Sequence, residues 1–253
     1  MTSLLDPDEP PAVAQYNAEG GSRFFLVCDH AGNRIPRKLN GLGVSADDVK
    51  RHIGWDIGIA GVARRLSDKL NAHLVVSAYS RLVIDCNRPP GTEESIVTES
   101  DGTPVPGNRN LTSEDVEARQ REIFVPYHDA ITAALDARKS GQRDTILVSL
   151  HSFTPVYGGV ARPWHAGLLY NKYNGLAHPL RDALREGGVF NIGDMEPYTV
   201  DDETDYTVPV HGEARGLPHV AIEIRQDLIA EEAGQHEWAD RLAALLPRAA
   251  AKL

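Results

Sequence analysis

Short apolar segments alternate with longer segments of helical periodicity along most of this chain, and that alternation constrains the fold more than any other feature. Apolar runs bounded by polar residues are typical of buried strands, whereas apolar residues spaced three or four apart are typical of helices. Strands that alternate with helices form a mixed, mostly parallel sheet with helices on both faces. We therefore expect an α/β fold whose ligand lies at the carboxyl ends of the strands. The predicted strands are residues 24–28, 73–78, 82–86, 145–150, 167–171 and 220–224, and the predicted helices are residues 46–70, 113–139, 175–186 and 235–250.

The length and the net charge limit the domain organisation and the partners. A chain of 253 residues suits one large α/β domain. We expect residues 1–20, which are acidic and rich in proline, to form a flexible N-terminal tail, and residues 21–253 to form a single domain. The net charge of −10 disfavours nucleic acid as a partner, because an acidic surface repels phosphate backbones. An acidic small molecule would instead need a local basic pocket.

The sequence carries no sign of export or of membrane insertion. The N-terminus lacks the basic start and the apolar core of a signal peptide. No apolar run approaches the roughly 20 residues that span a bilayer. Cys28 and Cys86 do not form a C-x-x-C motif, and two cysteines do not make a disulfide framework. We expect a cytoplasmic protein with no membrane partner.

Two histidines and one aspartate are candidate metal ligands. His30 and His151 each follow or end a hydrophobic strand, and Asp56 lies among small residues in HIGWDIGIAG, which we expect to be helical. A catalytic zinc ion takes three such ligands and leaves one position for water. The spacing alone does not exclude the alternatives: a histidine at a strand end is often only hydrogen-bonded, and other histidines compete. The competitors are His52, His128, His165, His211 and His219.

A glutamate in the last predicted strand is a candidate general base. Glu223 lies in the apolar segment AIEIRQDLI, where burial of an unpaired carboxylate is costly and raises its pKa. A carboxylate beside an activated water can take its proton and return it to a leaving amine. The alternative is a structural ion pair with Arg225, which lies two residues further on and therefore on the same face of the strand.

The segment SRLVIDCNRPPG contains the basic side chains that an acidic ligand requires. Asn87 and Arg88 could hold a substrate carboxylate, because the guanidinium group grips carboxylates with two parallel hydrogen bonds. Arg81 could stabilise the oxyanion that forms when water adds to a carbonyl. The alternative is a structural ion pair between Arg88 and Asp85.

Several motifs together resemble those of the N-formylglutamate amidohydrolase family, which is related to the zinc carboxypeptidases. The resemblance runs in order from about residue 23 to residue 230, and its most specific motifs are SR-x-V-x-D-x-NRP and E-x-R-x-D-L. It implies the phosphorylase/hydrolase-like fold of the zinc carboxypeptidases. It also implies hydrolysis of N-formyl-L-glutamate to formate and glutamate with the help of one zinc ion. The similar segments are VCDHAGNRIP, SRLVIDCNRP, LHSFTP, Met195 to Tyr198 and VHGEARGLPHVAIEIRQDLI.

The resemblance also suggests roles for individual residues. His151-Ser152-Phe153 is similar to the carboxypeptidase segment that supplies a zinc ligand, Asn87-Arg88 to the pair that holds a terminal carboxylate, and Glu223-Ile224-Arg225 to the segment with the general base. One departure matters: carboxypeptidases use H-x-x-E, but Asn33 stands three residues after His30. Asp56 is then the carboxylate ligand by default.

The resulting hypothesis is a single-domain α/β metallohydrolase that acts on a small acidic N-acyl amino acid. Two rival functions remain: a zinc carboxypeptidase or peptidoglycan amidase-like enzyme, and a non-catalytic acyl-amino-acid binding protein. Residues 91–110 form a long, turn-rich segment that we expect to shape the pocket. The predicted site residues are the metal ligands His30, Asp56 and His151, the catalytic residues Glu223 and Arg81, and the substrate-binding residues Asn87 and Arg88.

Overall fold

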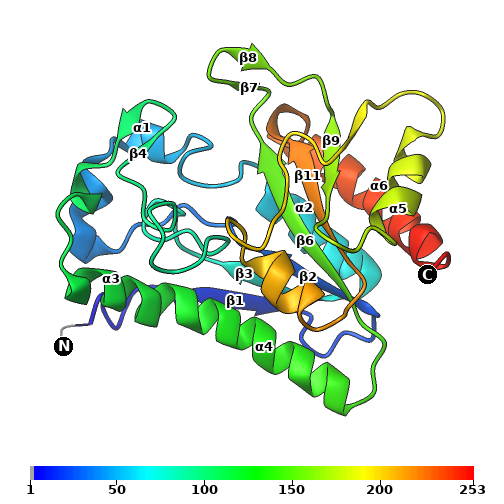
Figure 1. Ribbon diagram of the computed structural model, residues 1–253, viewed down its shortest axis with the longest axis horizontal. Coiled ribbons are helices and arrows are strands. Elements are labelled where there is room, and N and C mark those ends of the chain that lie inside the picture. The colour runs from blue at the N-terminus through cyan, green and yellow to red at the C-terminus, as the bar shows by residue number, and fades with distance from the viewer. Residues whose placement is uncertain (1–2) are drawn as a thin grey trace.

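A seven-stranded sheet forms the centre of the computed structural model, which describes residues 3–253 (Figure 1). Four neighbouring strands in the middle of the sheet are parallel, and an antiparallel pairing begins on each side of them. This arrangement confirms the predicted mixed, mostly parallel α/β sheet. In spatial order the strands are β1 (Val13–Tyr16), β3 (His73–Ser77), β2 (Phe24–Cys28), β6 (Ile146–Phe153), β11 (His219–Arg225), β9 (Ala166–Leu169) and β10 (Ile192–Asp194).

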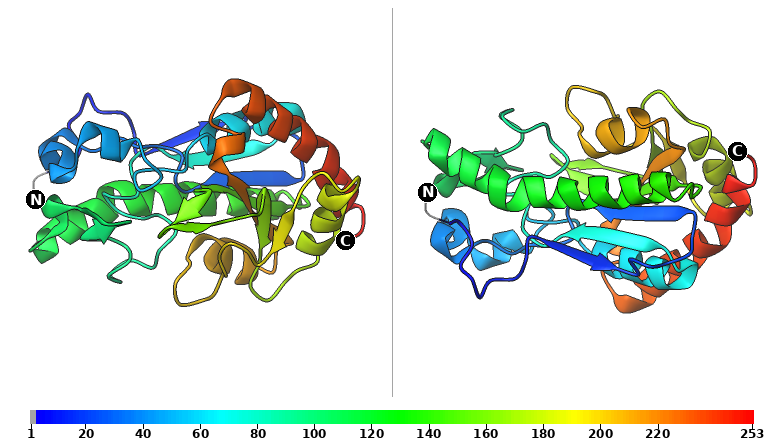
Figure 2. Two further views of the ribbon diagram at one scale, coloured as in Figure 1. Left: turned by 90° about the horizontal axis from the view of Figure 1, so that it is seen from above. Right: turned by 90° about the horizontal axis from the view of Figure 1, so that it is seen from below.

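Helices cover both faces of this sheet (Figures 1 and 2). The first face packs against α2 (Ile59–Leu70), α5 (Ala177–Arg185) and α6 (Glu232–Ala250). The second face packs against α4 (Val125–Ser140), which follows α3 (Ser113–Arg119) and a π-helical turn, η3 (Gln120–Phe124). The remaining short elements are η1 (Arg37–Gly43), α1 (Ala46–Val49), β4 (Glu99–Ser100), β5 (Thr103–Pro104), η2 (Pro106–Asn108), β7 (Val156–Tyr157), β8 (Val160–Ala161), η4 (Val208–Glu213) and η5 (Gln226–Leu228).

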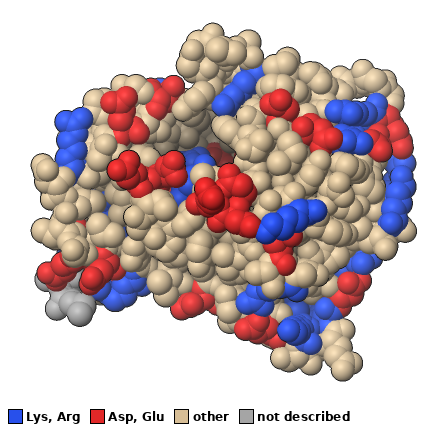
Figure 3. Space-filling model, in the orientation of Figure 1, with Lys and Arg blue, Asp and Glu red and all other residues tan. Residues whose placement is uncertain are grey.

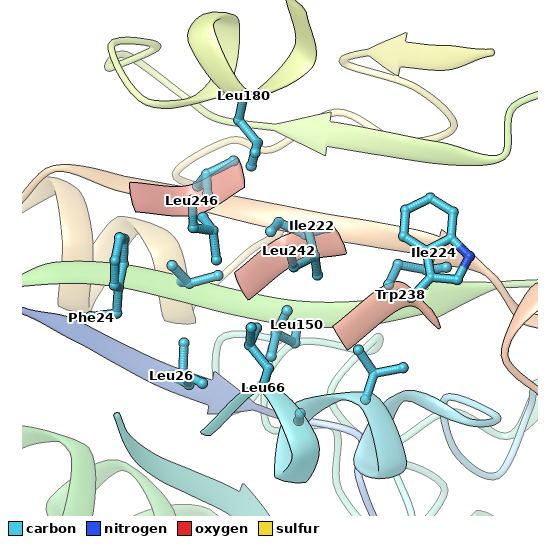
Figure 4. Close-up of a cluster of buried hydrophobic side chains, with 14 of the residues drawn as sticks. Phe24, Leu26, Leu66, Leu150, Leu180, Ile222, Ile224, Trp238, Leu242 and Leu246 are labelled. Atoms are coloured by element: carbon cyan, nitrogen blue, oxygen red, sulfur yellow. The ribbon is translucent and has the colours of Figure 1, made fainter. Parts of the chain in front are cut away.

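Alternation of side chains along the central strands explains why their sequences are apolar throughout. In β2, Phe24, Leu26 and Cys28 belong to the core on the first face, whereas Phe25 and Val27 belong to the core on the second. A strand that is covered on both faces must present apolar groups to each of them. Figure 4 shows the first of these cores, in which side chains from the sheet meet those of α2, α5 and α6.

The predicted helix over residues 46–70 is wrong in its middle. Helix α1 ends at Val49 and α2 begins at Ile59, and the residues between them form turns. Gly58 adopts φ 82°, and a Cβ atom there would lie 2.1 Å from the carbonyl oxygen of Ile229. Only glycine tolerates both conditions, so the chain turns here and Asp56 lies in a loop.

The predicted strand over residues 82–86 is also wrong, because these residues form turns and irregular backbone. Leu82, Val83 and Ile84 are buried in the core on the second face without pairing in a sheet. A short apolar run predicts burial, but burial does not require an extended backbone.

The expected flexible tail over residues 1–20 is corrected in part. Residues 13–16 form β1, which pairs antiparallel with β3 at the edge of the sheet. The pairing joins residues about sixty positions apart, such as Val13 and Ser77. No local sequence pattern predicts such a long-range pairing. Residues 1 and 2 lie outside the described part of the chain.

Helix prediction over residues 113–139 holds with one change in its geometry. The π-helical turn η3 directly precedes α4, and the first turn of α4 contains Pro126. Proline lacks the N–H group that would close a regular helical turn.

Within residues 3–253, no helix is both long enough and apolar enough to cross a bilayer.

Candidate active site

Three adjacent parallel strands bring the candidate residues to one edge of the sheet. Asp29 and His30 directly follow β2, while His151 lies near the end of β6 and Glu223 near the end of β11. His151 and Glu223 are register partners, so their side chains emerge side by side on the same face. Carboxyl ends of parallel strands are where ligands bind in such sheets.

Asp56 reaches this edge from the loop before α2. Its backbone N–H donates a hydrogen bond to the carbonyl of His30 at 3.0 Å, which ties the loop to the end of β2. Its Oδ2 accepts a hydrogen bond from the backbone N–H of Ser152 at 3.1 Å. Arg81 Nη1 lies 3.5 Å from the other carboxylate oxygen. The carboxylate is therefore held between β2 and β6.

His30, Asp56 and His151 form a buried cluster that could hold a metal ion. One ligand atom from each residue lies within 4.8 Å of the other two. Asp56 Oδ2 is 3.0 Å from His151 Nδ1 and 3.5 Å from His30 Nδ1. Among residues 3–253, His30 Nδ1 has no hydrogen-bond partner although it is buried. Two imidazole nitrogens and one carboxylate are a ligand set typical of a catalytic divalent metal.

Each histidine is oriented by a second carboxylate. His30 Nε2 lies 2.6 Å from Asp85 Oδ1, and His151 Nε2 lies 3.0 Å from Asp29 Oδ2. Both Nε2 atoms are thus occupied, which leaves both Nδ1 atoms facing Asp56. Carboxylates behind metal-ligating histidines fix the ring and its tautomer in this way. This role of Asp29 and Asp85 was not predicted from the sequence, although Asp29 lies in the motif VCDHAGNRIP and Asp85 in the motif SRLVIDCNRP.

Asp29 is itself anchored in the interior. Its Oδ1 accepts hydrogen bonds from Tyr127 Oη at 2.8 Å and from Thr207 Oγ1 at 2.7 Å. Burial raises the pKa of Asp29, but the hydrogen bond and the charge of His151 outweigh burial and lower it overall. For His151 burial acts in the opposite direction and lowers the pKa. Its hydrogen bonds to Asp29 and Asp56 outweigh burial and raise the pKa well above the ordinary value. A metal ion bound at Nδ1 would displace any proton held on that atom.

We expect Asp29→Asn to lower metal affinity by about 10- to 100-fold, the usual cost of losing such an outer carboxylate. Competition with a fluorescent chelator measures this affinity directly. Asp194→Asn is the matched control, because Asp194 pairs with Arg181 away from the cluster. Equal metal affinity in Asp29→Asn and in the wild type would contradict the orienting role.

Glu223 stands beside this cluster as a buried carboxylate. Only 7% of its surface is exposed, and within the described chain its Oε2 has no hydrogen-bond partner. Burial raises the pKa of Glu223 to about 7, although the charge of His151 opposes the rise. The alternative ion pair with Arg225 is not formed, because Arg225 leaves the strand end to bind Asp227 at 2.8 Å. A carboxylate with a pKa near neutrality is suited to proton transfer.

The three remaining predicted residues, Arg81, Asn87 and Arg88, donate to carboxylates at the side of the cluster. Arg81 donates to Asp85 Oδ2 through Nε at 3.0 Å and through Nη2 at 2.6 Å. The predicted alternative pair of Arg88 and Asp85 is therefore replaced by Arg81 and Asp85. Asn87 Nδ2 and Arg88 Nη1 instead each lie 3.1 Å from Asp205 Oδ1. Asp205 was not foreseen from the sequence.

Four of the five competing histidines are engaged elsewhere, and the fifth, His52, has its Nε2 atom 3.3 Å from Asp101 Oδ2. His128 and His211 form a separate buried pair, with 2.9 Å between His128 Nδ1 and His211 Nε2. His219 bonds to the carbonyl of Leu217, and His165 accepts from the backbone N–H of Asn191. Burial lowers the pKa of His211 to about 3.

A cavity of about 320 Å³ opens onto the cluster. Residues 91–110 contribute Glu94, Val97 and Ser100 to its wall, as predicted for that segment. Tyr157, from the β7–β8 hairpin, and Tyr198 also line it. Figure 3 shows the hollow, with basic atoms in its depth and acidic side chains around its mouth. Such a volume suits a small molecule.

Comparison with known proteins gives a consistent family. The sequence model of the N-formylglutamate amidohydrolase family matches residues 22–230. No curated protein matches the chain. The solved structure of gene product Atu2144 from Agrobacterium tumefaciens is 37% identical, with a TM-score of 0.95 over 98% of this chain and 98% of that chain. The N-formylglutamate amidohydrolase from Ralstonia eutropha JMP134 shares the fold, at 20% identity and a TM-score of 0.75 over 96% of this chain and 98% of that chain. The match to the family model covers most of the sequence, and the chain belongs to the N-formylglutamate amidohydrolase family of hydrolases.

Proposed function

We propose that this chain is a zinc-dependent amidohydrolase that cleaves an N-formyl or other N-acyl amino acid. N-formyl-L-glutamate, which would yield formate and glutamate, is the first substrate to test. One observation carries the proposal: a buried cluster of His30, Asp56 and His151 lies beside Glu223, a buried carboxylate without an ion-pair partner in the described chain. Family membership supports the same reaction class.

The ligand set favours zinc over harder metals. Imidazole nitrogens suit zinc, whereas magnesium and calcium prefer oxygen ligands alone. His30 Nδ1, which lacks a hydrogen-bond partner in the described chain, and the shared oxygen of Asp56 provide a site that such an ion would complete. When bound, zinc supplies Lewis acidity, which polarises a carbonyl group and acidifies water.

Glu223 performs the proton transfers in the proposed mechanism. It takes a proton from the attacking water as the oxygen of that water bonds to the acyl carbon. It then delivers the same proton to the amide nitrogen as the C–N bond breaks, so that a carboxylic acid and a free amine leave. The position of Glu223 beside His151 in the sheet register supports this role.

Arginine and asparagine side chains would bind and orient the substrate. Arg81, held by Asp85, lines the cavity and would donate to the developing oxyanion. Asn87 and Arg88 would hold a carboxylate of the substrate. The cavity of about 320 Å³ supports a small acidic N-acyl amino acid over a polymeric substrate such as peptidoglycan.

Metal removal tests the proposal. We expect the purified protein to hydrolyse N-formyl-L-glutamate, to lose this activity when a chelator strips its metal, and to regain it with about one equivalent of Zn²⁺ but not with Mg²⁺. Formate release measures the activity, and elemental analysis verifies that the metal has left. Full activity in verified metal-free protein would rule the proposal out. A panel of N-formyl and N-acetyl amino acids identifies the acyl group.

A further inference from the structure

A carboxylate of the chain itself occupies the donors that would hold a substrate carboxylate. We call these donors, Asn87 Nδ2 and Arg88 Nη1, the carboxylate fork. Both lie 3.1 Å from Asp205 Oδ1. The other oxygen of Asp205 accepts from the backbone N–H of Asp201 at 3.2 Å. The fork therefore has the geometry to bind a carboxylate, and Asp205 fills it.

The fork and Asp205 lie in the wall of the cavity. Asp205 is 8% exposed, and it lines the cavity together with Asn87 and Arg88. The backbone N–H of Asn87 donates to Asp85, the carboxylate that also orients His30. The fork is thus connected through one residue to the candidate metal cluster.

Hydrogen bonds hold the segment around Asp205 against the fork. Asn87 Oδ1 accepts from the backbone N–H of Thr207 at 2.9 Å, and Arg88 Nη1 also donates to the carbonyl of Thr204 at 2.8 Å. These bonds do not involve the Asp205 carboxylate. Substitution of that carboxylate alone therefore leaves most of the local structure in place.

The cavity lining has more acidic than basic groups, and its two guanidinium groups are already paired. Arg81 binds Asp85, and Arg88 binds Asp205. A substrate carboxylate that reaches the fork must compete with Asp205 for Arg88 and also approach its negative charge. The described carboxylates of the lining are Asp56, Asp85, Glu94, Asp205 and Glu223, against the guanidinium groups of Arg81 and Arg88.

We propose that Asp205 determines the charge specificity of the site by competing with the substrate carboxylate for the fork of Asn87 and Arg88. The inference rests on the proposed function for the identity of the substrate, but the competition itself concerns carboxylate binding. Asp205 keeps the affinity for acidic ligands low. It thereby reduces the difference in kcat/KM between an acidic substrate and its neutral amide. Removal of its charge releases Arg88 for the ligand.

One pair of substrates, acidic and neutral, and one inert dicarboxylate test this competition in the zinc-loaded protein. Asp205→Asn should raise kcat/KM for N-formyl-L-glutamate relative to N-formyl-L-glutamine by about 10-fold or more, mainly through a lower KM. It should tighten the binding of glutarate, measured by calorimetry, by a similar factor. Adding Arg88→Ala to Asp205→Asn should cancel both gains, because the released guanidinium group is their source. Asp205→Ser is made in parallel, and thermal melting verifies that each variant is folded.

The matched control is Asp202→Asn. Asp202 lies in the same loop and pairs with Lys172, so its substitution removes one negative charge without touching the fork. It should leave glutarate binding and the substrate ratio near wild type. Equal glutarate affinity in the wild type and in both folded Asp205 variants would overturn the inference, as would an equal gain in Asp202→Asn. If no variant hydrolyses either substrate but the Asp205 variants bind glutarate more tightly, the proposed function fails and the inference on Asp205 stands.

Discussion

Replacement of either His30 or His151 by alanine is expected to abolish tight metal binding and, with it, hydrolysis. Each substitution removes one of three clustered ligand atoms, and the two that remain cannot hold a catalytic ion at neutral pH. The metal content of the purified protein should fall from about one equivalent per chain to near zero. Elemental analysis after gel filtration measures it, and thermal melting verifies that the variants are folded.

A matched control and a third ligand variant sharpen this test. His236→Ala replaces an exposed histidine on α6 and should retain the metal. Asp56→Asn keeps the size of the side chain but removes its charge, and it should weaken metal binding as well. Undiminished metal in His30→Ala or His151→Ala would show that the ion, if any, binds elsewhere.

Glu223→Gln is expected to lower kcat by about 10²- to 10⁴-fold, the usual contribution of a general base. Glutamine keeps the size of the side chain but cannot take the proton from water. The metal content should stay at the wild-type value, because Glu223 is not part of the ligand cluster. Formate release and elemental analysis on the same preparation measure both quantities.

The pH dependence of stability distinguishes this catalytic role from a structural one. In the folded, metal-free chain burial raises the pKa of Glu223 to about 7, above the ordinary value of 4.5. Between these values the folded state binds more protons than the unfolded state, so the free energy of unfolding falls as the pH rises through this window. In Glu223→Gln the free energy of unfolding does not fall in this way, because glutamine does not titrate. The variant should therefore be at least as stable as the wild type at pH 8.

A structural partner of a buried cation would behave in the opposite way. Its substitution would leave an uncompensated buried charge and lower the free energy of unfolding by about 3–5 kcal/mol, the usual cost of breaking a buried ion pair. A Glu223→Gln protein that unfolds readily yet turns over normally while folded would remove Glu223 from the mechanism. Urea unfolding of the metal-free proteins at pH 5 and pH 8 measures the difference.

Several candidate residues could be predicted because their signals are local. His30 and His151 stand at the ends of apolar runs, and Glu223 interrupts another. Parallel strands place their carboxyl ends at one edge, so the three were expected to be near each other, and the structure brings them together. Asp56 had no such local signal, and the sequence analysis placed it in a helix. Gly58, which turns the chain there, is required by its positive φ and by its close contact with Ile229, and both depend on the folded structure.

The sequence by itself determined the class of the fold, because periodic burial of apolar side chains is recorded in the order of residues along each strand and helix. It also determined the family, through motifs that run across most of the chain. Only the tertiary structure decided which charged groups meet: Asp29 behind His151, 122 positions away, and Asp205 in the fork of Asn87 and Arg88, more than a hundred positions away. The physical reason is that a buried charge must find a partner wherever the packed chain supplies one, and that choice depends on contacts between distant segments.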